Sequence, residues 1–204
     1  MSKFSEYIGS QFGNPRGLIG RCCCIIMNII NNAMYKSVID DICINEKSNV
    51  LDIGYGNGNL IHKIYKKYKS TIFGIDISED MKNSATKRNQ KAVDCGKVFL
   101  SVGDCCELNF DNNFFDAVTS INTIYFWNDT LTGLNEIHRV LKKNGIFYNV
   151  IYSKEWLKRL SYTKKGFEFF ETDDYISLGY EAGFSEVLVK NIANEKSYMI
   201  CFKK

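Results

Sequence analysis

The 204-residue chain has few of the residues that build metal sites and covalent cross-links. It contains two histidines, and its eight cysteines form no C-x-x-C pair of the kind that holds zinc. Adjacent cysteines such as Cys22 and Cys23 seldom bond to each other, because their side chains point in different directions. We therefore expect no metal site and no structural disulfide, and interpret the cysteines as small buried residues in a reducing compartment.

Long apolar runs and a dominant charge are also absent. The run 22–30 is shorter than the roughly 20 apolar residues that span a bilayer, and Lys3 and Arg16 interrupt any N-terminal signal peptide. A net charge of +3 gives no reason to propose a nucleic-acid partner, and the basic stretches 62–69 and 158–165 are interpreted as solvated faces. We expect a cytoplasmic protein with no membrane span.

The most informative segment is a strand that leads through glycines into a helix. The apolar run 50–53 predicts a buried strand, and Gly54, Gly56 and Gly58 follow it before the helical pattern of 60–68. Glycine at such a turn lets the backbone bend sharply and lets a ligand approach closely. The helix N-terminus beyond it favours negative charge. The segment predicts a site for a nucleoside-containing cofactor.

The spacing of these glycines distinguishes two classes of cofactor. A dinucleotide site needs G-x-G-x-x-G, which counted from Gly54 requires glycine at Asn59. Here the third glycine comes one residue earlier, and Asp52 lies in the strand ahead of the loop. The pattern hh-D-h-G-x-G-x-G resembles the first motif of class I S-adenosylmethionine-dependent methyltransferases. A nicotinamide oxidoreductase is therefore disfavoured.

Two further segments resemble that family's cofactor motifs, in the same order. Asp76 ends the predicted strand 71–76, where an acidic residue can accept hydrogen bonds from ribose hydroxyls. In the family this residue holds both hydroxyls. The strand 97–102 leads to Asp104, whose counterpart reaches the adenine amine, and to Cys105, whose counterpart offers a backbone N–H to the ring.

The fourth and fifth matches follow. The strand 115–121 leads to Asn122, which the resemblance places facing the reacting methyl group, and 136–145 resembles the helix and turn before the family's fifth strand. Segment 12–17 also looks like small bacterial methyltransferases named after quinone biosynthesis. The resemblance implies S-adenosylmethionine as cofactor and S-adenosylhomocysteine as product. The candidate cofactor-binding residues are Asp52, Gly54, Tyr55, Gly56, Gly58, Asp76, Ile77, Met81, Asp104, Cys105 and Asn122.

The order of elements predicts an α/β fold. Strands alternate with helices, which requires right-handed crossovers and a doubly wound, mostly parallel sheet. The strands are expected near 49–53, 71–76, 97–102, 115–121 and 145–151, and the helices near 58–68, 79–90 and 129–141. A helix over 173–182 and two alternating runs, 184–189 and 197–202, predict a C-terminal antiparallel hairpin, which gives seven strands of the Rossmann-like class I type.

We expect one methyltransferase domain, 1–204, because a chain of this length and of ordinary composition fits a single globular unit. The helical period over 18–41 indicates N-terminal helices. We divide the domain into an N-terminal helical lid or cap (1–45), a cofactor-binding core (46–152) and a C-terminal helix and hairpin (153–204). The sequence does not indicate the oligomeric state.

The acceptor side is defined less sharply. Tyr125 and Trp127 follow the strand that ends near Asn122, so they are candidates to wall the substrate pocket. The alternative is that they pack beneath the helix 129–141. Tyr7 and Phe12 are candidates for a lid over the pocket.

No catalytic residue is identified. His62 and His138 are both expected on solvated helix faces, so no general base is apparent. This favours an acceptor that is already nucleophilic, such as a thiol, an amine or an activated carbon, over a hydroxyl that needs deprotonation. The reaction is then an in-line methyl transfer, in which positioning the acceptor is the main task.

Two alternatives on function stay open. Segment 122–125 reads Asn-Thr-Ile-Tyr and lacks the prolines found there in enzymes that methylate nucleic-acid bases, so a small-molecule acceptor is favoured. The residue after the first loop glycine is the bulky Tyr55, where the family usually has a small one. If Tyr55 narrows the cofactor pocket, the chain could instead be a non-catalytic cofactor-binding regulatory or accessory protein.

Overall fold

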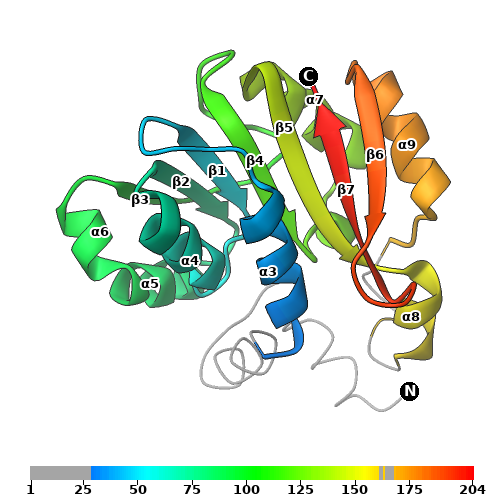
Figure 1. Cartoon of the computed structure of the whole chain (residues 1–204), viewed down its shortest axis with the longest axis horizontal. Coiled ribbons are helices and arrows are strands. Elements are labelled where there is room, and N and C mark those ends of the chain that lie inside the picture. The colour runs from blue at the N-terminus through cyan, green and yellow to red at the C-terminus, as the bar shows by residue number, and fades with distance from the viewer. Residues whose placement is uncertain (1–28, 161–162, 164–167) are drawn as a thin grey trace.

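A seven-stranded sheet runs through the centre of the computed structural model, which describes residues 29–160, 163 and 168–204 (Figure 1). The strand order is β3-β2-β1-β4-β5-β7-β6, and β7 alone runs in the direction opposite to the other six strands. The predicted doubly wound sheet with a C-terminal antiparallel hairpin is confirmed. The strands are β1 (Asn49–Ile53), β2 (Thr71–Asp76), β3 (Val98–Val102), β4 (Phe115–Ile121), β5 (Leu141–Tyr152), β6 (Glu186–Asn191) and β7 (Ser197–Lys203).

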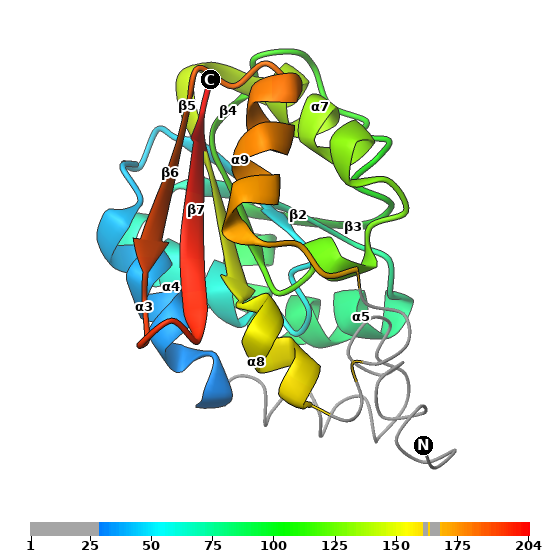
Figure 2. The same cartoon turned by 90° about the vertical axis from the view of Figure 1, so that its right-hand side faces the viewer.

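Helices cover both faces of this sheet. Figure 2 shows α3 and α4 on one side of the sheet, with α7 and α9 on the other. The described helices are α3 (Asn32–Asp41), α4 (Asn59–Tyr68), α5 (Glu79–Arg88), α6 (Gln90–Asp94), the short 3₁₀ helix η1 (Ile124–Phe126), α7 (Thr130–Val140), α8 (Lys154–Arg159) and α9 (Thr172–Glu181). None of them combines the length and apolar character needed to cross a membrane.

The central strands are buried on both faces, which explains their nearly continuous apolar sequences. Val50 and Leu51 of β1 and Val118 of β4 have no solvent exposure. The helix α4 shows the complementary pattern, because Ile61 and Ile64 are buried against the sheet while the intervening His62 is exposed. The predicted outward position of His62 is therefore confirmed.

The observed elements differ from the sequence-based expectation at several points. The helix expected over 79–90 is interrupted at Asn89, whose side-chain amide donates to the carbonyls of Gly58 and Ala85 and so competes with helix continuation. The fifth strand begins at Leu141 rather than 145, with a shift in its register against β4 near Phe115. The helix α8 was not predicted; Ser153 caps it, accepting from the backbone N–H of Trp156.

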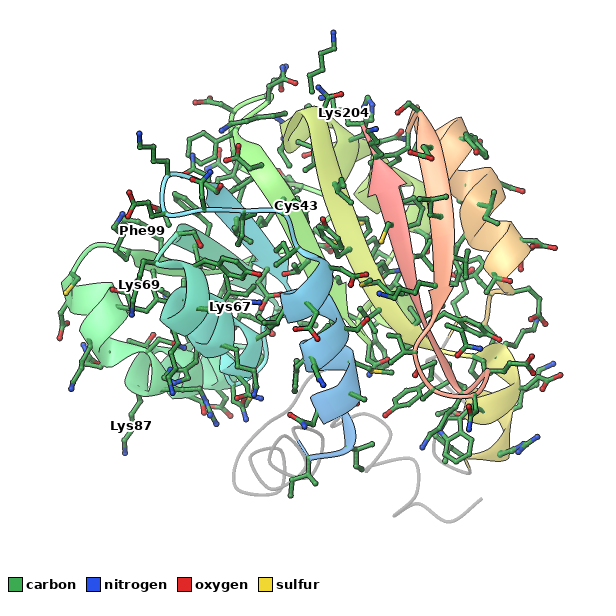
Figure 3. The ribbon with its side chains drawn as sticks, viewed as in Figure 1. Cys43, Lys67, Lys69, Lys87, Phe99 and Lys204 are labelled. Carbon is green, nitrogen blue, oxygen red and sulfur yellow. The ribbon has the colours of Figure 1, made fainter. Side chains whose placement is uncertain are left out.

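The interpretation of the cysteines is partly wrong. Five described cysteines are free thiols, as expected, but Cys43 and Cys95 are exposed rather than buried. Both lie where an element has ended: Cys43 follows α3, and Cys95 is the residue after α6, just before Gly96. Figure 3 shows Cys43 among the labelled side chains.

Candidate functional site

The glycine loop after β1 uses each of its glycines differently. Gly54, Gly56 and Gly58 all have positive φ, the region that favours glycine. A Cβ on Gly54 would lie 2.2 Å from the side chain of Thr123, and one on Gly58 would lie 2.6 Å from that of Asn89. A Cβ on Gly56 would meet nothing within 4 Å. Two glycines therefore permit packing, and Gly56 borders open space that a ligand can approach.

Asp76 connects the end of β2 to this loop. One carboxylate oxygen accepts from the backbone N–H of Gly56 and the other from that of Ser78, both at 2.9 Å. Burial raises the pKa of the carboxyl group, and the two backbone hydrogen bonds oppose that rise. The next side chain, Ile77, is 50% exposed, whereas Met81 on α5 is fully buried. Ile77 is thus open to solvent, whereas the Asp76 side chain is 8% exposed and Met81 packs in the core.

Asp52 lies behind the loop rather than at its surface. Its side chain is 2% exposed and accepts a hydrogen bond from the Thr119 hydroxyl on β4 at 2.7 Å. Burial raises the pKa of Asp52 to about 7, and the nearby Asp76 adds to the rise while the Thr119 hydrogen bond opposes it. The carboxyl group therefore joins β1 to β4.

Tyr55 points into the core and leaves the open side of the loop clear. Its hydroxyl donates to the carbonyl of Ser101 on β3 at 3.0 Å. A Cβ on Gly74 of β2 would lie 2.6 Å from the Tyr55 ring, so the absence of a side chain at Gly74 makes room for it. The bulky residue thus spans β2 and β3 from beneath.

Asp104 and Cys105 follow β3 in a tightly hydrogen-bonded turn. The Asp104 carboxylate accepts from the backbone N–H of Cys106 at 2.9 Å and from the Asn128 side chain at 2.8 Å. Cys105 is buried, and burial raises the pKa of its thiol. Thiol and carboxylate atoms of residues 104–106 lie within 4.8 Å of one another, but Cys106 donates to the carbonyl of Asp129. The Asp104 carboxylate and the Cys106 thiol are therefore hydrogen-bonded to other groups of the protein.

The ends of β4 and β5 meet in a buried network of neutral polar groups. Asn122 has φ +58 and is 8% exposed; its amide nitrogen donates to Asn31 at 3.2 Å, and its amide oxygen accepts from the Tyr125 hydroxyl at 3.2 Å. The Tyr152 hydroxyl donates to the same Asn31 oxygen at 2.9 Å. Asn31 and Tyr152 were not singled out from the sequence, because only the fold brings them beside Asn122.

The aromatic residues proposed as pocket walls lie mostly in the core. Trp127 is 9% exposed, stacks on Phe147 with ring centroids 6.3 Å apart, and lies against Gly133 of α7, where a Cβ would be 2.7 Å from its ring. Tyr125 is 4% exposed. Trp127 therefore packs beneath α7, which was the alternative to a place in the pocket wall. Tyr7 and Phe12 lie outside the described residues.

His138 departs from expectation. It is half-buried on α7, edge-on to the ring of Phe184 with centroids 5.1 Å apart. The chain after α9 packs there, and a Cβ on Gly183 would lie 3.5 Å from the imidazole. Burial and the charge of Lys204 lower the pKa of His138. The expectation of a solvated His138 was wrong because the distant segment 183–184 covers it.

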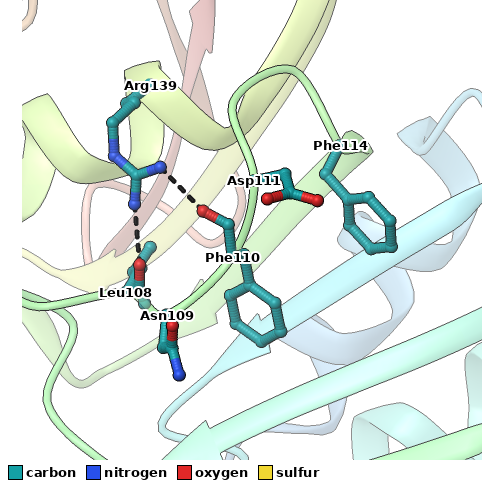
Figure 4. A pocket seen from close by; sticks show the side chains of 6 residues that line it. All are labelled: Leu108, Asn109, Phe110, Asp111, Phe114 and Arg139. Carbon is teal, nitrogen blue, oxygen red and sulfur yellow. Dashed lines mark hydrogen bonds between the residues drawn. The ribbon is translucent and has the colours of Figure 1, made fainter.

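A hollow of about 350 Å³ lies elsewhere, at the start of β4 (Figure 4). The Arg139 guanidinium at its wall donates to the carbonyls of Leu108 and Phe110, both at 2.7 Å, and also pairs with Glu136. These bonds hold the loop between β3 and β4 in place. The hollow contains no predicted site residue and lies at the opposite strand ends from Gly54, Asp76 and Asn122.

Comparisons with known proteins agree with the geometry at the carboxyl ends. Residues 51–149 match the family model of the methyltransferase domain. The putative methyltransferase YrhH of Bacillus subtilis is 33% identical over 126 residues, which cover 61% of this chain and 69% of that protein. The ubiquinone/menaquinone biosynthesis C-methyltransferase UbiE of Citrifermentans bemidjiense is 31% identical over 150 residues, covering 71% of this chain and 63% of the enzyme. The chain thus spans less than two thirds of that enzyme.

Solved structures show the same fold. A putative methyltransferase, solved with the Haloferax volcanii Trm112 methyltransferase activator, matches all of this chain and 98% of its own with a TM-score of 0.75 at 20% identity. Phosphoethanolamine N-methyltransferase 2 of Haemonchus contortus, solved with S-adenosyl-L-methionine, matches 79% of this chain and 38% of its own with a TM-score of 0.67 at 24% identity. The chain belongs to the class I S-adenosylmethionine-dependent methyltransferase family. It is a methyltransferase whose cofactor is S-adenosylmethionine.

The residues at the carboxyl ends fit this cofactor. Asp76 presents a carboxylate for hydroxyl groups, and the open side of Gly56 leaves space for close approach. Val102, paired in register with Asp76, is 43% exposed, so the end of β3 beside this carboxylate is open to solvent. Val102 was not picked out from the sequence, although its place beside Asp76 follows from parallel pairing of the two strands.

Proposed function

We propose that this enzyme methylates a small organic molecule whose reacting atom is nucleophilic without help from a protein base. S-adenosylmethionine, when bound, supplies an electrophilic methyl group on a sulfonium. The supporting observation is the neutral character of the acceptor edge, where Asn31, Asn122, Tyr125 and Tyr152 bond to one another. Burial raises the pKa of Tyr125 well above its ordinary value, so its hydroxyl stays protonated and no tyrosinate forms to act as a base.

The cofactor contacts belong to the same proposal. The loop from Gly54 to Gly58 lies under the amino-acid end, and Asp76 binds the ribose hydroxyls. Ile77 covers the adenine, with Asp104 and the backbone of Cys105 at its edge. Asp52, Tyr55 and Met81 support these residues from the core, since all three side chains are buried.

The chain's contribution to the reaction is positioning. An in-line displacement needs the acceptor lone pair opposite the leaving sulfur, and holding that geometry supplies much of the acceleration. Asn122 ends β4 at the point where the cofactor half and the acceptor half of the sheet meet, so its backbone and amide fix the floor of the acceptor pocket. Residues 1–45, with Tyr7 and Phe12, are proposed as the lid that excludes water.

Among nucleophilic acceptors, an activated aromatic carbon has the strongest support. Similar proteins include the C-methyltransferase UbiE, and a demethylmenaquinone methyltransferase of Bacteroides fragilis that is 33% identical over 97 residues. Ring carbons beside a hydroxyl group in a quinol are electron-rich and react with an electrophilic methyl group. A quinol or related phenol is therefore the first acceptor to test, followed by thiols and amines.

A turnover assay tests this proposal. The full chain is incubated with S-adenosylmethionine and representative quinols, phenols, thiols and amines, and S-adenosylhomocysteine and methylated product are quantified. We expect carbon-methylated product from a quinol, abolished in Asp76→Ala and retained in Glu79→Ala, whose side chain is 65% exposed. Exclusive methylation of a neutral alcohol would contradict the proposal, because that reaction needs a base at the acceptor edge.

A further inference from the structure

The strand β3 forms an outer edge of the sheet without the usual protection. Its sequence, Val98-Phe-Leu-Ser-Val102, contains no charge and no proline. Phe99 is 47% exposed and Val102 is 43% exposed; Phe99 is labelled at this edge in Figure 3. Edge strands of monomeric proteins usually carry lysine, proline or a bulge, because unpaired backbone groups invite pairing with another strand. The β3 edge lacks these features.

The opposite edge, β6, is protected. Glu186 lies 3.9 Å from Lys203, and Lys190 lies 2.6 Å from Asp41 of α3. Charged side chains therefore stand along β6 and are paired within the chain. The two edges of the sheet thus differ in charge: β6 carries paired charged side chains and β3 carries none. The β3 edge is therefore the one suited to pairing with a strand of another molecule.

The hydrogen bonds between β2 and β3 show which backbone groups face outward. Ile72 donates its N–H to the carbonyl of Lys97 at 2.8 Å, and Gly103 donates to the carbonyl of Asp76 at 3.1 Å. In a parallel ladder alternate residues bond to the same neighbour, so positions 97, 99, 101 and 103 face β2. Val98, Leu100 and Val102 consequently direct their backbone groups to the open edge, where no strand of the described part of the chain pairs with them.

We infer that the β3 edge binds β3 of a second copy of this chain in antiparallel register, centred on Leu100. The three outward residues then pair with one another: Val98 with Val102 of the second copy, and Leu100 with its own counterpart. Each exposed Phe99 lies beside Ser101 of the other copy. Side chains directly opposite each other in such a ladder share a face, so the apolar surface is covered symmetrically.

Charge selects the antiparallel orientation. Lys97 precedes the strand, and Asp104 and the exposed Glu107 follow it. Antiparallel pairing about Leu100 brings Lys97 opposite Gly103 of the second copy, beside Asp104, so opposite charges meet at both ends. Parallel pairing would place Lys97 beside Lys97 and Asp104 beside Asp104, which is unfavourable. The strand is complementary to itself in one orientation only. This inference does not depend on the identity of the methyl acceptor.

Sedimentation velocity on the full chain, from about 1 to 100 µM, tests the interface. We expect a dimer whose dissociation constant rises at least tenfold in Phe99→Lys. The matched control is Leu188→Lys on β6, also an exposed apolar edge residue at 57% exposure, which should leave the dimer unchanged. Circular dichroism confirms that each variant is folded. A wild-type chain that stays monomeric throughout, or a dimer weakened equally by both variants, would overturn the inference.

A charge exchange tests the register. Lys97→Glu should weaken the dimer, because the introduced carboxylate then lies beside Asp104 of the second copy. Adding Asp104→Lys restores opposite charges at both ends and should recover dimerisation. Because the readout is mass rather than methyl transfer, an effect of Asp104 on the cofactor site does not interfere. Failure of the double variant to recover the dimer, with both variants folded, would contradict the antiparallel register.

Discussion

The two halves of the sheet's carboxyl edge are built in different ways. At the ends of β1 and β2, the backbone shapes the predicted cofactor site: Gly54, Gly56 and Gly58 have positive φ, and Asp76 accepts from two backbone N–H groups. At the ends of β4 and β5, neutral side chains from distant parts of the chain bond to one another. The best example is the contact between Asn31 and Tyr152, which are 121 residues apart.

This difference separates two tasks. A backbone site with a buried carboxylate is fixed in shape, which suits a cofactor that is always the same. A side-chain network can change residue by residue while the fold stays constant, which suits an acceptor that differs among relatives. The predictions below test whether the first half depends on backbone geometry and charge, and the second on hydrogen bonds between side chains.

The largest effect is expected from Gly54→Ala. Its φ of +68 strains any side chain, and the new Cβ would lie 2.2 Å from Thr123, so we expect a loss of more than about 3 kcal/mol of unfolding free energy. Gly56→Ala is the control, since it has a similar φ of +52 but open space around the Cβ. It should cost about 1–2 kcal/mol. Equal losses in denaturant unfolding would show that Thr123 does not restrict the loop.

The next effect concerns affinity. Asp76→Ala removes charge-assisted hydrogen bonds of about 1.5–3 kcal/mol each, so calorimetry should show S-adenosylhomocysteine binding at least tenfold more weakly. The control is Glu79→Ala, because Glu79 is exposed whereas the neighbouring Asp80 is half-buried. The melting temperature of Asp76→Ala should also fall, because the N–H groups of Gly56 and Ser78 lose their acceptors. Equal affinities for the two variants would place the ribose ligand elsewhere.

A pH effect follows from Asp52. Burial raises its pKa from 3.8 to about 7, so the folded state favours the uncharged carboxyl group. The contribution of the Asp52 carboxyl group to the free energy of unfolding is therefore greatest below pH 3.8, where the group is protonated in both states. This contribution is lost as the pH rises toward 7 and the buried group must ionise. Asp52→Asn keeps an acceptor for Thr119 without the charge, so its melting temperature should exceed that of the wild type at pH 8 and approach it near pH 4. If the difference in melting temperature between Asp52→Asn and the wild type were the same at pH 4 and pH 8, the raised pKa of Asp52 would be contradicted.

The smallest effect on stability belongs to the acceptor half. Tyr152→Phe removes one hydrogen bond to Asn31, at a cost of about 1 kcal/mol. Cofactor affinity should remain unchanged while methyl transfer slows, because the network lies at the acceptor edge. Tyr180→Phe, on an α9 side chain that is 54% exposed, should change neither. Weaker cofactor binding in Tyr152→Phe would mean that the two halves are not separate.

Sequence reasoning succeeded where a local pattern determines a local shape. The glycine spacing after Ile53 predicted a sharp turn, and Gly54, Gly56 and Gly58 all have positive φ there. The cofactor contacts assigned to this turn and to Asp76 stay a prediction. The alternating elements likewise predicted the sheet and its antiparallel hairpin. Side-chain direction was harder: whether Tyr55 faces the ligand or the core depends on Gly74 and Ser101, in two other strands.

The side-chain contacts at the ends of β4 and β5 could not be predicted either, because they join residues that are distant in the sequence. Asn31 belongs to a helical run with no motif, and Tyr152 ends a strand whose start was misplaced by four residues because its register shifts near Phe115. His138 is half-buried only because the chain after α9 packs against α7. Each of these depends on contacts between residues far apart in the sequence, which periodicity does not encode.

Calorimetric titration of the wild-type chain with S-adenosylhomocysteine, S-adenosylmethionine and NAD tests the central claim most directly. We expect both sulfur-containing ligands to bind and to raise the melting temperature by mass action, and NAD to do neither. At the same ligand concentration Asp76→Ala should show a smaller shift than the wild type, and Glu79→Ala the same shift. A saturating concentration of S-adenosylhomocysteine that produces no heat and no shift in melting temperature would contradict the assignment of the cofactor to the ends of β1, β2 and β3.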